Sequence, residues 1–335
     1  MFEPSVIPRV FGLPPGVDFP RMLVAGVRAR MAGQPPEAMA AVTLYLNTTR
    51  MRERVQAAFV AAGAGFLPRL IALTDIGADP TFDAPPAVPK IRRRLELSLP
   101  VARLVAAEPR FAPGSAIYDL ADSLALLAEE MQDEGVTPKA FENPAMAEDH
   151  AAHWERSLAF LRIIAPWFDS DAQPDAATRQ RLAIAALIAR WRASPPTRPV
   201  LVAGSTGSRG TTQSLMRAVA SLPQGALILP GFDDDMPDFG WDNLFSAPIP
   251  NEDHPQYRFA HLMASLGIGP GQVARWTDVS GFDAPRNRLV SLALRPAPVT
   301  DHWLTEGAAL GPLLPATAGM TLIEAMVAIV VVGVA

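Results

Sequence analysis

The sequence predicts an α/β protein whose parallel sheet is interrupted by a large helical insertion. Near both ends of the chain, short apolar runs alternate with helical segments, which is the pattern of a layered α/β domain. Between residues 81 and 195, apolar residues instead recur at three- and four-residue spacing, as in helices. The 34 prolines mostly separate apolar segments, so we expect many short elements joined by rigid turns.

The elements expected from these patterns divide the chain into four parts. We expect a first α/β part at 1–80, a helical insertion at 81–195, a second α/β part at 196–318 and an apolar tail at 319–335. The expected strands cover residues 5–11, 42–46, 66–73, 199–203 and 226–229. The expected helices cover residues 19–31, 51–62, 91–107, 115–134, 147–164, 176–193 and 211–221.

Composition limits the classes of function. A net charge of −5 gives no global basic field for nucleic acid, although a local basic patch can still bind it. The absence of cysteine excludes disulfides, thiolate zinc sites and iron–sulfur clusters within these residues. It also fits a reducing compartment, and the first residues lack the pattern of a secretory signal, so we expect a cytoplasmic protein.

The turn after the first expected strand lacks the chemistry of a nucleotide site. A phosphate-binding loop needs free backbone amides and a Lys-Ser/Thr pair. Here the turn from Gly12 to Gly16 contains two prolines, which remove two donor amides, and Asp18 follows where it would repel phosphate. We therefore expect a degenerate ATP position and no cofactor bound by this chain.

The second expected strand ends in polar and basic residues suited to a DNA backbone. These residues are Asn47, Thr48 and Thr49 at the turn, and Arg50, Arg52 and Arg54 at the helix start. Hydroxyls, an amide, a helix N-terminus and added positive charge can together hold a phosphate. The other interpretation, which the residues alone favour, is an ordinary N-cap followed by a solvated basic helix face.

The loop from Gly204 to Gly210 also admits more than one interpretation. Arg209 and the loop amides could contact phosphate or DNA, but a strand–helix turn that needs small residues explains the loop nearly as well. Ser205 lies in a relaxed nucleophile-elbow pattern, which makes a serine hydrolase the enzymatic alternative. The elbow's first glycine is missing, which argues against it.

Three further groups are weaker candidates. His150 and His153 lie one helical turn apart without zincin spacing, so a surface helix is the better interpretation than a metal site. Residues 233–235 with Asp238 could ligate magnesium, but we expect an acidic, solvated loop. Residues 92–94, three arginines at a helix start, oppose the helix dipole there, which favours an external partner such as DNA phosphate.

Several segments together resemble AddB of the alphaproteobacterial type, the non-motor subunit of the AddAB helicase–nuclease. They are 5–21 (SVIPRVFGLPPGVDFPR), 42–54 (VTLYLNTTRMRER), 66–77 (FLPRLIALTDIG), 199–210 (PVLVAGSTGSRG), 226–232 (ALILPGF) and 252–259 (EDHPQYRF). The resemblance implies a helicase-1A-like (RecA-like) sheet with a helical 1B-like insertion. It also implies a scaffold for double-strand break repair that binds AddA, double-strand ends and single strands, with no small-molecule substrate. In that complex, ATP and Mg²⁺ act through AddA and a nuclease domain.

The last residues depart from the AddB pattern. Residues 319–335 are similar to a type IV prepilin segment, with Gly319 before the cleavage point, Met320 as the new N-terminus and Glu324 at mature position five. This gives a third alternative, a prepilin-like membrane-associated protein. The stretch is short for a bilayer span, and Glu324 would be costly in lipid. Because the AddB resemblance stops here, before any nuclease domain, we expect a truncated or joined reading frame.

Overall fold

The computed structural model of the chain describes residues 1–63, 65–78, 82, 85–107, 116–141, 151–168, 173–246, 251–278, 284–296 and 299–310, with the backbone alone at 151–156 and 308–310. The chain divides into two compact units. The sheet unit contains the described residues of Met1–Leu73, Pro195–Ser208 and Met216–Ala335, and the helical unit contains those of Thr74–Ser194 and Arg209–Leu215.

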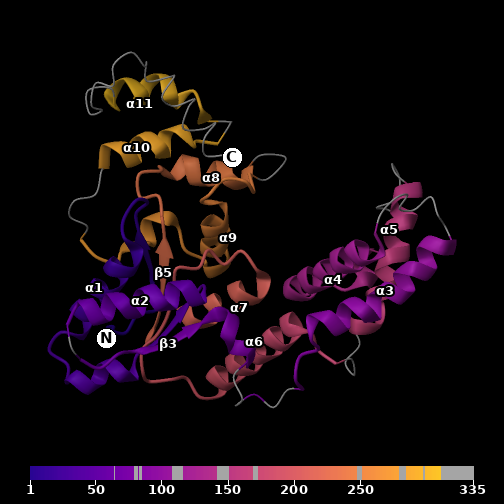
Figure 1. The fold of residues 1–335 in the computed structure, drawn as a ribbon. Helices are drawn as coiled ribbons and strands as arrows, with labels where there is room; N and C mark the ends of the chain where they lie inside the picture. The colour runs from indigo at the N-terminus through magenta and orange to yellow at the C-terminus, as the bar shows by residue number, and fades with distance from the viewer. Residues whose placement is uncertain are drawn as a thin grey trace. The chain divides into compact units, whose positions relative to one another are not determined.

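The sheet unit is built on six parallel strands in the order β3-β2-β4-β5-β1-β6 (Figure 1). The strands are β1 (Val10–Leu13), β2 (Thr43–Leu46), β3 (Arg69–Ala72), β4 (Val200–Ala203), β5 (Gly225–Pro230) and β6 (Ala274–Arg275). β4 and most of β5 are buried along their length, as expected for central strands covered on both faces. The predicted α/β class with a parallel sheet is therefore confirmed.

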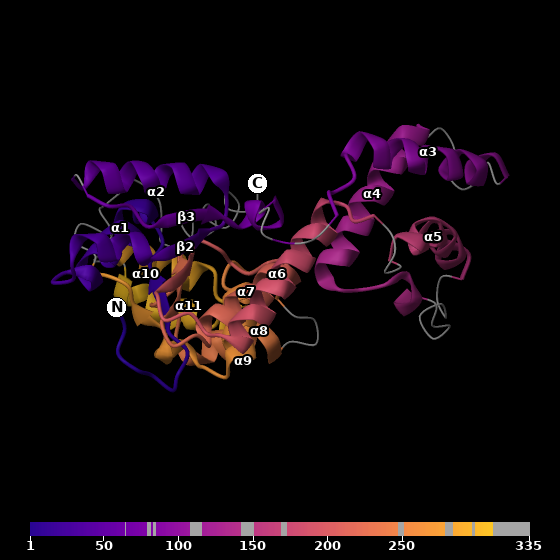
Figure 2. The ribbon, with the colours of Figure 1, turned by 90° about the horizontal axis from the view of Figure 1, so that it is seen from below.

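Helices cover both faces of this sheet. α1 (Phe19–Met31) and α2 (Thr49–Ala61) lie on one face, and α8 (Asp238–Ser246) and α9 (Tyr257–Leu266) lie on the other (Figure 2). Alternate strand residues point to opposite faces, so Leu44, Leu46 and Leu201 join one buried cluster with α1 and α2. The remaining helical elements of the sheet unit are η1 (Pro36–Ala41), η6 (Pro270–Gln272), α10 (Ala284–Ala293) and α11 (His302–Leu310). Two further elements, η2 (Leu73–Ala78) and α7 (Gly210–Ala220), have residues in both units.

Most of the helical unit lies between β3 and β4 in the sequence. Its elements are α3 (Lys90–Ala107), α4 (Ile117–Glu134), η3 (Pro138–Phe141), α5 (Ala151–Ile164), η5 (Ala165–Phe168) and α6 (Ala176–Ala193). α3, α4 and α5 share a separate core around Leu97, Val101, Leu124 and Ile164. Because this core is built only from helical faces, the unit has its own source of hydrophobic stability.

The first strand differs from its prediction. The expected strand at 5–11 is β1 at Val10–Leu13, because the residues before it form a turn. The Ser5 hydroxyl bonds the backbone of Ile7, Val6 is fully exposed, and Pro8 has no amide to donate to a ladder. Similarly, β3 begins at Arg69, directly after Pro68, and not at residue 66.

Candidate nucleic-acid interface

In open parallel sheets, a ligand crevice is expected outside the carboxyl ends of neighbouring strands whose connections leave in opposite directions, and β2 and β4 are such a pair. These strands are neighbours, but β2 connects outward to β3 while β4 connects to β5 in the opposite direction. The segments that follow the two strands are 47–49 and 204–208, which the sequence singled out separately. The structure therefore brings these two candidate segments to one place.

Gly204 and Asn47 approach each other in this crevice. Gly204 has a φ of +75°, and a Cβ there would lie 3.3 Å from the Phe19 ring and 3.6 Å from Asn47 Oδ1. Glycine fits because the conformation is left-handed. Asn47 Oδ1 is buried and has no hydrogen-bond partner within the described ranges, so this side chain has unused hydrogen-bonding capacity at the crevice.

Thr48 and Thr49 begin α2 at the same edge. Thr48 is the N-cap, within the 47–49 turn where the alternative interpretation placed one, and its Oγ1 accepts a hydrogen bond from the Met51 amide at 3.1 Å. Thr48, Thr49 and Arg50 are exposed, so the positive end of the α2 dipole faces solvent. This is the geometry of a helix N-terminus that can receive an anion, although the cap already uses one amide.

The three predicted arginines lie on two sides of α2. Arg50 and Arg54 are four residues apart and share one side, whereas Arg52 lies on another side and makes other interactions. The three arginines therefore do not all lie on one side of α2. Sequence spacing of two residues looks local but corresponds to a rotation of about 200° on a helix.

An arginine that the sequence interpretation missed completes the patch. Asp18 Oδ2 lies 3.8 Å from Arg21 Nε on α1, and Asp18 Oδ1 lies 3.9 Å from Arg54 Nη2 on α2. Their side chains are 76% (Arg21), 59% (Arg54) and 45% (Asp18) exposed. We call Arg21, Arg50 and Arg54 the basic cluster; with Asp18 it has three positive charges and one negative charge. Arg21 was detectable, because it lies three residues after the capping Asp18.

The β1–α1 turn has structural reasons for its glycines. A Cβ on Gly12 would lie 2.9 Å from Phe232 Cβ, so Gly12 allows close packing. Gly16 has a φ of +82°, and the preceding Pro15 carbonyl accepts a hydrogen bond from Asn287 Nδ2 at 2.7 Å. Asp18 caps α1 by accepting from the Arg21 amide at 3.2 Å. A carboxylate thus occupies the helix end where a nucleotide site would present free amides.

Arg209 already has a partner in the helical unit. Its Nη1 lies 3.0 Å from Asp133 Oδ2, while the Gly210 amide donates to Glu134 Oε1 at 3.0 Å. Burial raises the pKa of Asp133, an effect opposed by Arg209 and by the Thr211 hydroxyl. The N-terminus of α7 therefore receives carboxylates from α4. This pairing argues against Arg209 and the Gly210 amide as phosphate contacts.

Comparison with known protein families and curated sequences gave no match. The AddB resemblance consequently rests on the sequence segments alone.

Ser205 does not have the surroundings of a catalytic nucleophile. It is buried, and its Oγ accepts a hydrogen bond from the Gly207 amide at 3.2 Å, as in a tight turn. His254 is occupied elsewhere: Nδ1 accepts from the Gln256 amide at 3.1 Å, so Nε2 donates to the Leu294 carbonyl at 2.7 Å. Both ring nitrogens of His254 are therefore in use, and His254 does not serve as a general base for Ser205.

The acidic loop after β5 is not the solvated loop that was predicted. Asp233 is buried, and its Oδ1 accepts from the amides of Asp235 and Met236 at 3.0 and 3.1 Å. Asp234 and Asp235 pair with Arg275 and Arg288 at 3.0 and 3.5 Å. Burial raises the pKa of both Asp233 and Asp234. Within the described residues, no group of three or more His, Cys, Asp or Glu is arranged to hold a metal ion.

The arginines at 92–94 are paired inside the helical unit. Arg92 and Arg93 both contact Glu96, at 2.8 and 3.0 Å, and Arg94 contacts Asp122 at 3.0 Å. Arg93 also lies over the Trp167 ring, with its Cζ 4.0 Å from the centroid. These contacts replace the external partner that the sequence favoured.

Some candidates lie outside the described residues: His150, the side chain of His153, and the prepilin-like Gly319, Met320 and Glu324. In the ranges that the structure does describe, no helix is both long enough and apolar enough to cross a bilayer.

Proposed function

We propose that this chain is an AddB-like subunit of a helicase–nuclease complex for recombinational repair of double-strand breaks, in which it holds DNA and binds AddA. The six-stranded parallel sheet supports this proposal, because β5 lies between β1 and β4 as expected for a RecA-like core. The helical unit between β3 and β4 fits a 1B-like insertion. The quoted AddB-like segments include the turns that follow β1, β2 and β4.

The observation on which DNA binding rests is the basic cluster beside the β2–β4 crevice. Arg21, Arg50 and Arg54 lie on two packed helices at the carboxyl edge, where Asn47 and the α2 N-terminus also lie. Exposed guanidinium groups and helix amides are the groups that contact phosphate oxygens without reading sequence. The cluster is therefore suited to backbone contacts that set the register of a strand.

The β1–α1 turn supports a subunit that relies on another chain for ATP hydrolysis. Pro14 and Pro15 provide no amides, and Asp18 places negative charge at the α1 N-terminus. A nucleoside triphosphate would meet this carboxylate where a phosphate-binding loop has a lysine. Under the proposal, ATP and Mg²⁺ chemistry belongs to AddA and to a nuclease domain.

The test measures binding of the whole chain to a fluorescent forked duplex at several salt concentrations, with and without AddA. Binding through Z phosphate contacts makes log Kobs fall with log salt at a slope of about −0.9Z. Each of Arg21→Gln, Arg50→Gln and Arg54→Gln should weaken binding and reduce that slope by up to about 1. Arg28→Gln, which removes an exposed arginine from the far end of α1, is the matched control.

Either of two results would overturn the proposal. The first is DNA binding whose salt slope is the same for the wild type and all three cluster variants. The second is an absence of both DNA binding and co-elution with AddA.

A further inference from the structure

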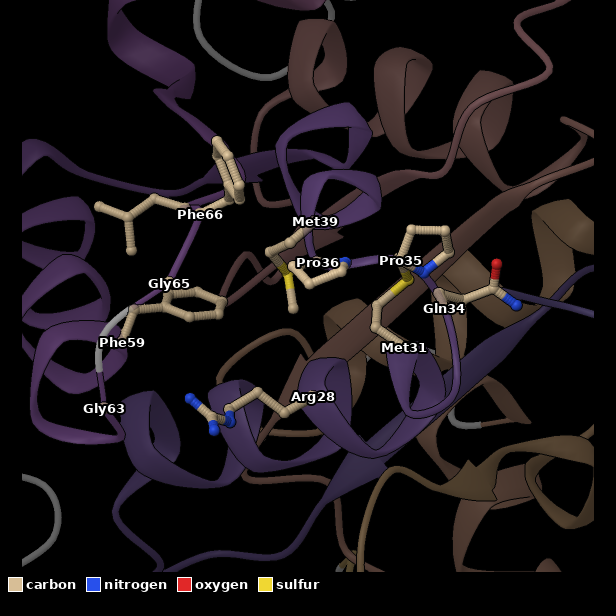
Figure 3. A pocket seen from close by; sticks show the side chains of 11 residues that line it. Arg28, Met31, Gln34, Pro35, Pro36, Met39, Phe59, Gly63, Gly65 and Phe66 are labelled. Atoms are coloured by element: carbon tan, nitrogen blue, oxygen red, sulfur yellow. The ribbon is translucent and has the colours of Figure 1, made fainter.

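A second concave surface lies at the amino edge of the sheet unit. It is a cavity of about 210 Å³ formed by the C-terminal end of α1, the segment leading into β2, and the segment joining α2 to β3 (Figure 3). Its lining residues are Arg28, Met31, Gln34, Pro35, Pro36, Met39, Phe59, Gly63, Gly65, Phe66 and Leu67. We call it the amino-edge pocket. It lies wholly within Met1–Leu73 of the sheet unit.

Most of the residues that line the amino-edge pocket have apolar side chains, although polar atoms supply about half of its accessible surface. Two methionines, two prolines and two phenylalanines face it, and Phe66 is 57% exposed although its ring is apolar. Figure 3 shows the side chains of Met31, Met39 and Phe59 around the opening. Methionine side chains are flexible and polarisable, so they adapt to an inserted apolar group.

Arg28 is the single charged residue in this lining. It is exposed, and it has no ion-pair partner within the part of the chain that the structure describes. In Figure 3, its side chain extends from α1 toward Phe59. Because Arg28 is exposed, an ion pair there contributes at most about 1 kcal/mol, so Arg28 can select a carboxylate while the apolar side chains supply most of the binding. The pocket therefore combines apolar walls with one unpaired cation.

The volume decides what kind of occupant fits. Sites for cofactors and drug-sized ligands usually measure about 300–1,000 Å³, so this pocket is too small for them. It suits one large side chain, which is how protein interfaces bury an anchor residue. We infer that the amino-edge pocket binds a segment of a partner protein that inserts one aromatic or large aliphatic side chain, with an adjacent carboxylate on Arg28.

This partner site is independent of the DNA proposal. The basic cluster lies at the N-terminal ends of α1 and α2, and the pocket lies at their C-terminal ends. Two surfaces on the same pair of helices can thus be tested separately with one purified protein.

The test uses the whole chain with ¹³C-methyl-labelled methionine, assigned through Met31→Leu and Met39→Leu, and two short peptides. One peptide is acetyl-Asp-Trp-Glu-amide, and the other is its neutral counterpart, acetyl-Asn-Trp-Gln-amide. Saturable shifts of the Met31 and Met39 methyl signals should appear with the acidic peptide, because an inserted indole ring changes their magnetic environment. The neutral peptide should bind up to about 5-fold more weakly, the size expected for one exposed ion pair.

Two variants separate the charge from the walls. Arg28→Gln should remove the difference between the two peptides, and Phe66→Ala should weaken both. Phe66 is exposed, so its replacement leaves the core intact. Arg54→Gln should leave peptide binding unchanged. Methyl shifts that are absent with both peptides would overturn the inference, as would shifts that do not distinguish the peptides or do not respond to Arg28→Gln.

Discussion

The two ends of the α1–α2 layer carry arginines in different surroundings. At the carboxyl edge of the sheet, Arg21 and Arg54 surround Asp18 in an exposed, charged cluster. At the amino edge, the same two helices end around Arg28, whose neighbours include Met31 and Phe59. One kind of side chain therefore has two different surroundings, and these surroundings decide whether it attracts a polyanion or a carboxylate next to an apolar group.

Helix direction explains part of this contrast. Both helices follow parallel strands and run back antiparallel to them, so their N-termini lie at the carboxyl edge. The positive dipole end favours Asp18 as the α1 cap and favours any phosphate that binds there. Arg28 and Arg30 lie in the last turn of α1, where the negative dipole end stabilises them. Stabilisation by the dipole leaves the Arg28 donors available.

The largest expected effect comes from a substitution under α1 that weakens both binding surfaces together. Trp276 is almost fully buried, its Nε1 donates to the Leu23 carbonyl of α1 at 3.1 Å, and Arg30 lies over its ring. Trp276→Ala should lower the free energy of unfolding by about 3–5 kcal/mol, since it leaves a large cavity under α1. Urea unfolding measures this loss, and both DNA and peptide binding should weaken together.

Trp303→Ala on α11 is the matched control for this variant, because Trp303 is only partly buried. If Trp276→Ala abolished one binding activity and left the other at wild-type strength, α1 would not support both edges.

The next effect tests whether the two edges are independent. Arg28→Gln combined with Arg54→Gln should show the DNA defect of Arg54→Gln and the peptide defect of Arg28→Gln, without additional loss. Substitutions that are far apart and share no partner usually add within about 0.5 kcal/mol. The two binding assays on the single and double variants provide the measurement. Coupling well above that value would mean that the two surfaces communicate through α1.

Local signals in the sequence predicted the elements of this layer well. The predicted bounds of α1 match the structure, because Asp18 caps it and apolar residues recur on one side. α6 also matches, with Asp175 as its cap. What failed was the assignment of partners: Arg209 pairs with Asp133, which is 76 residues away, and Asp234 pairs with Arg275 across 41 residues. Such pairs depend on strand order and helix packing, which periodicity does not encode.

The same reason explains which parts of the sites the sequence could give. Asn47 and Gly204 were each visible as turn residues, but their proximity needs β2 and β4 to be neighbours. The amino-edge pocket combines lining residues between 28 and 39 with others between 59 and 67, and β2 and most of α2 separate the two groups in the sequence. Arg28 alone looks like an ordinary solvated residue of a helix.

A smaller effect is expected at the carboxyl edge, where removal of one negative charge should strengthen DNA binding. Asp18→Asn keeps a side chain that caps α1 about as well, but it removes the negative charge between Arg21 and Arg54. DNA binding should tighten a few-fold, with a salt slope steeper by up to about 1, because both arginines can then face phosphate. Glu37→Gln, an equal charge change at the exposed η1, should leave the DNA slope unchanged. Weaker DNA binding by Asp18→Asn would exclude the cluster as the phosphate contact.

The smallest expected effect is the pH dependence of stability that comes from His254, which lies on the opposite face of the sheet from α1 and α2. It should change folding without changing either binding activity. Burial lowers the pKa of His254 from its usual 6.5, and the Leu294 carbonyl opposes this shift. The unfolded chain therefore takes up this proton near pH 6.5 but the folded chain only at lower pH. Its contribution to stability is complete above about pH 6.5 and is lost as pH falls below that value.

The aspartates change stability in the opposite sense as pH falls. Burial raises the pKa values of Asp133, Asp233 and Asp234 above 3.8, so the folded state gains protons first as pH falls toward that value. Urea unfolding between pH 7.5 and about 5.5 should therefore show a loss of stability that His254→Gln reduces. DNA and peptide binding by the folded protein should keep their ratio across this range, because His254 belongs to neither surface. A change at one edge alone, abolished by His254→Gln, would show that the layer behind the sheet controls that edge.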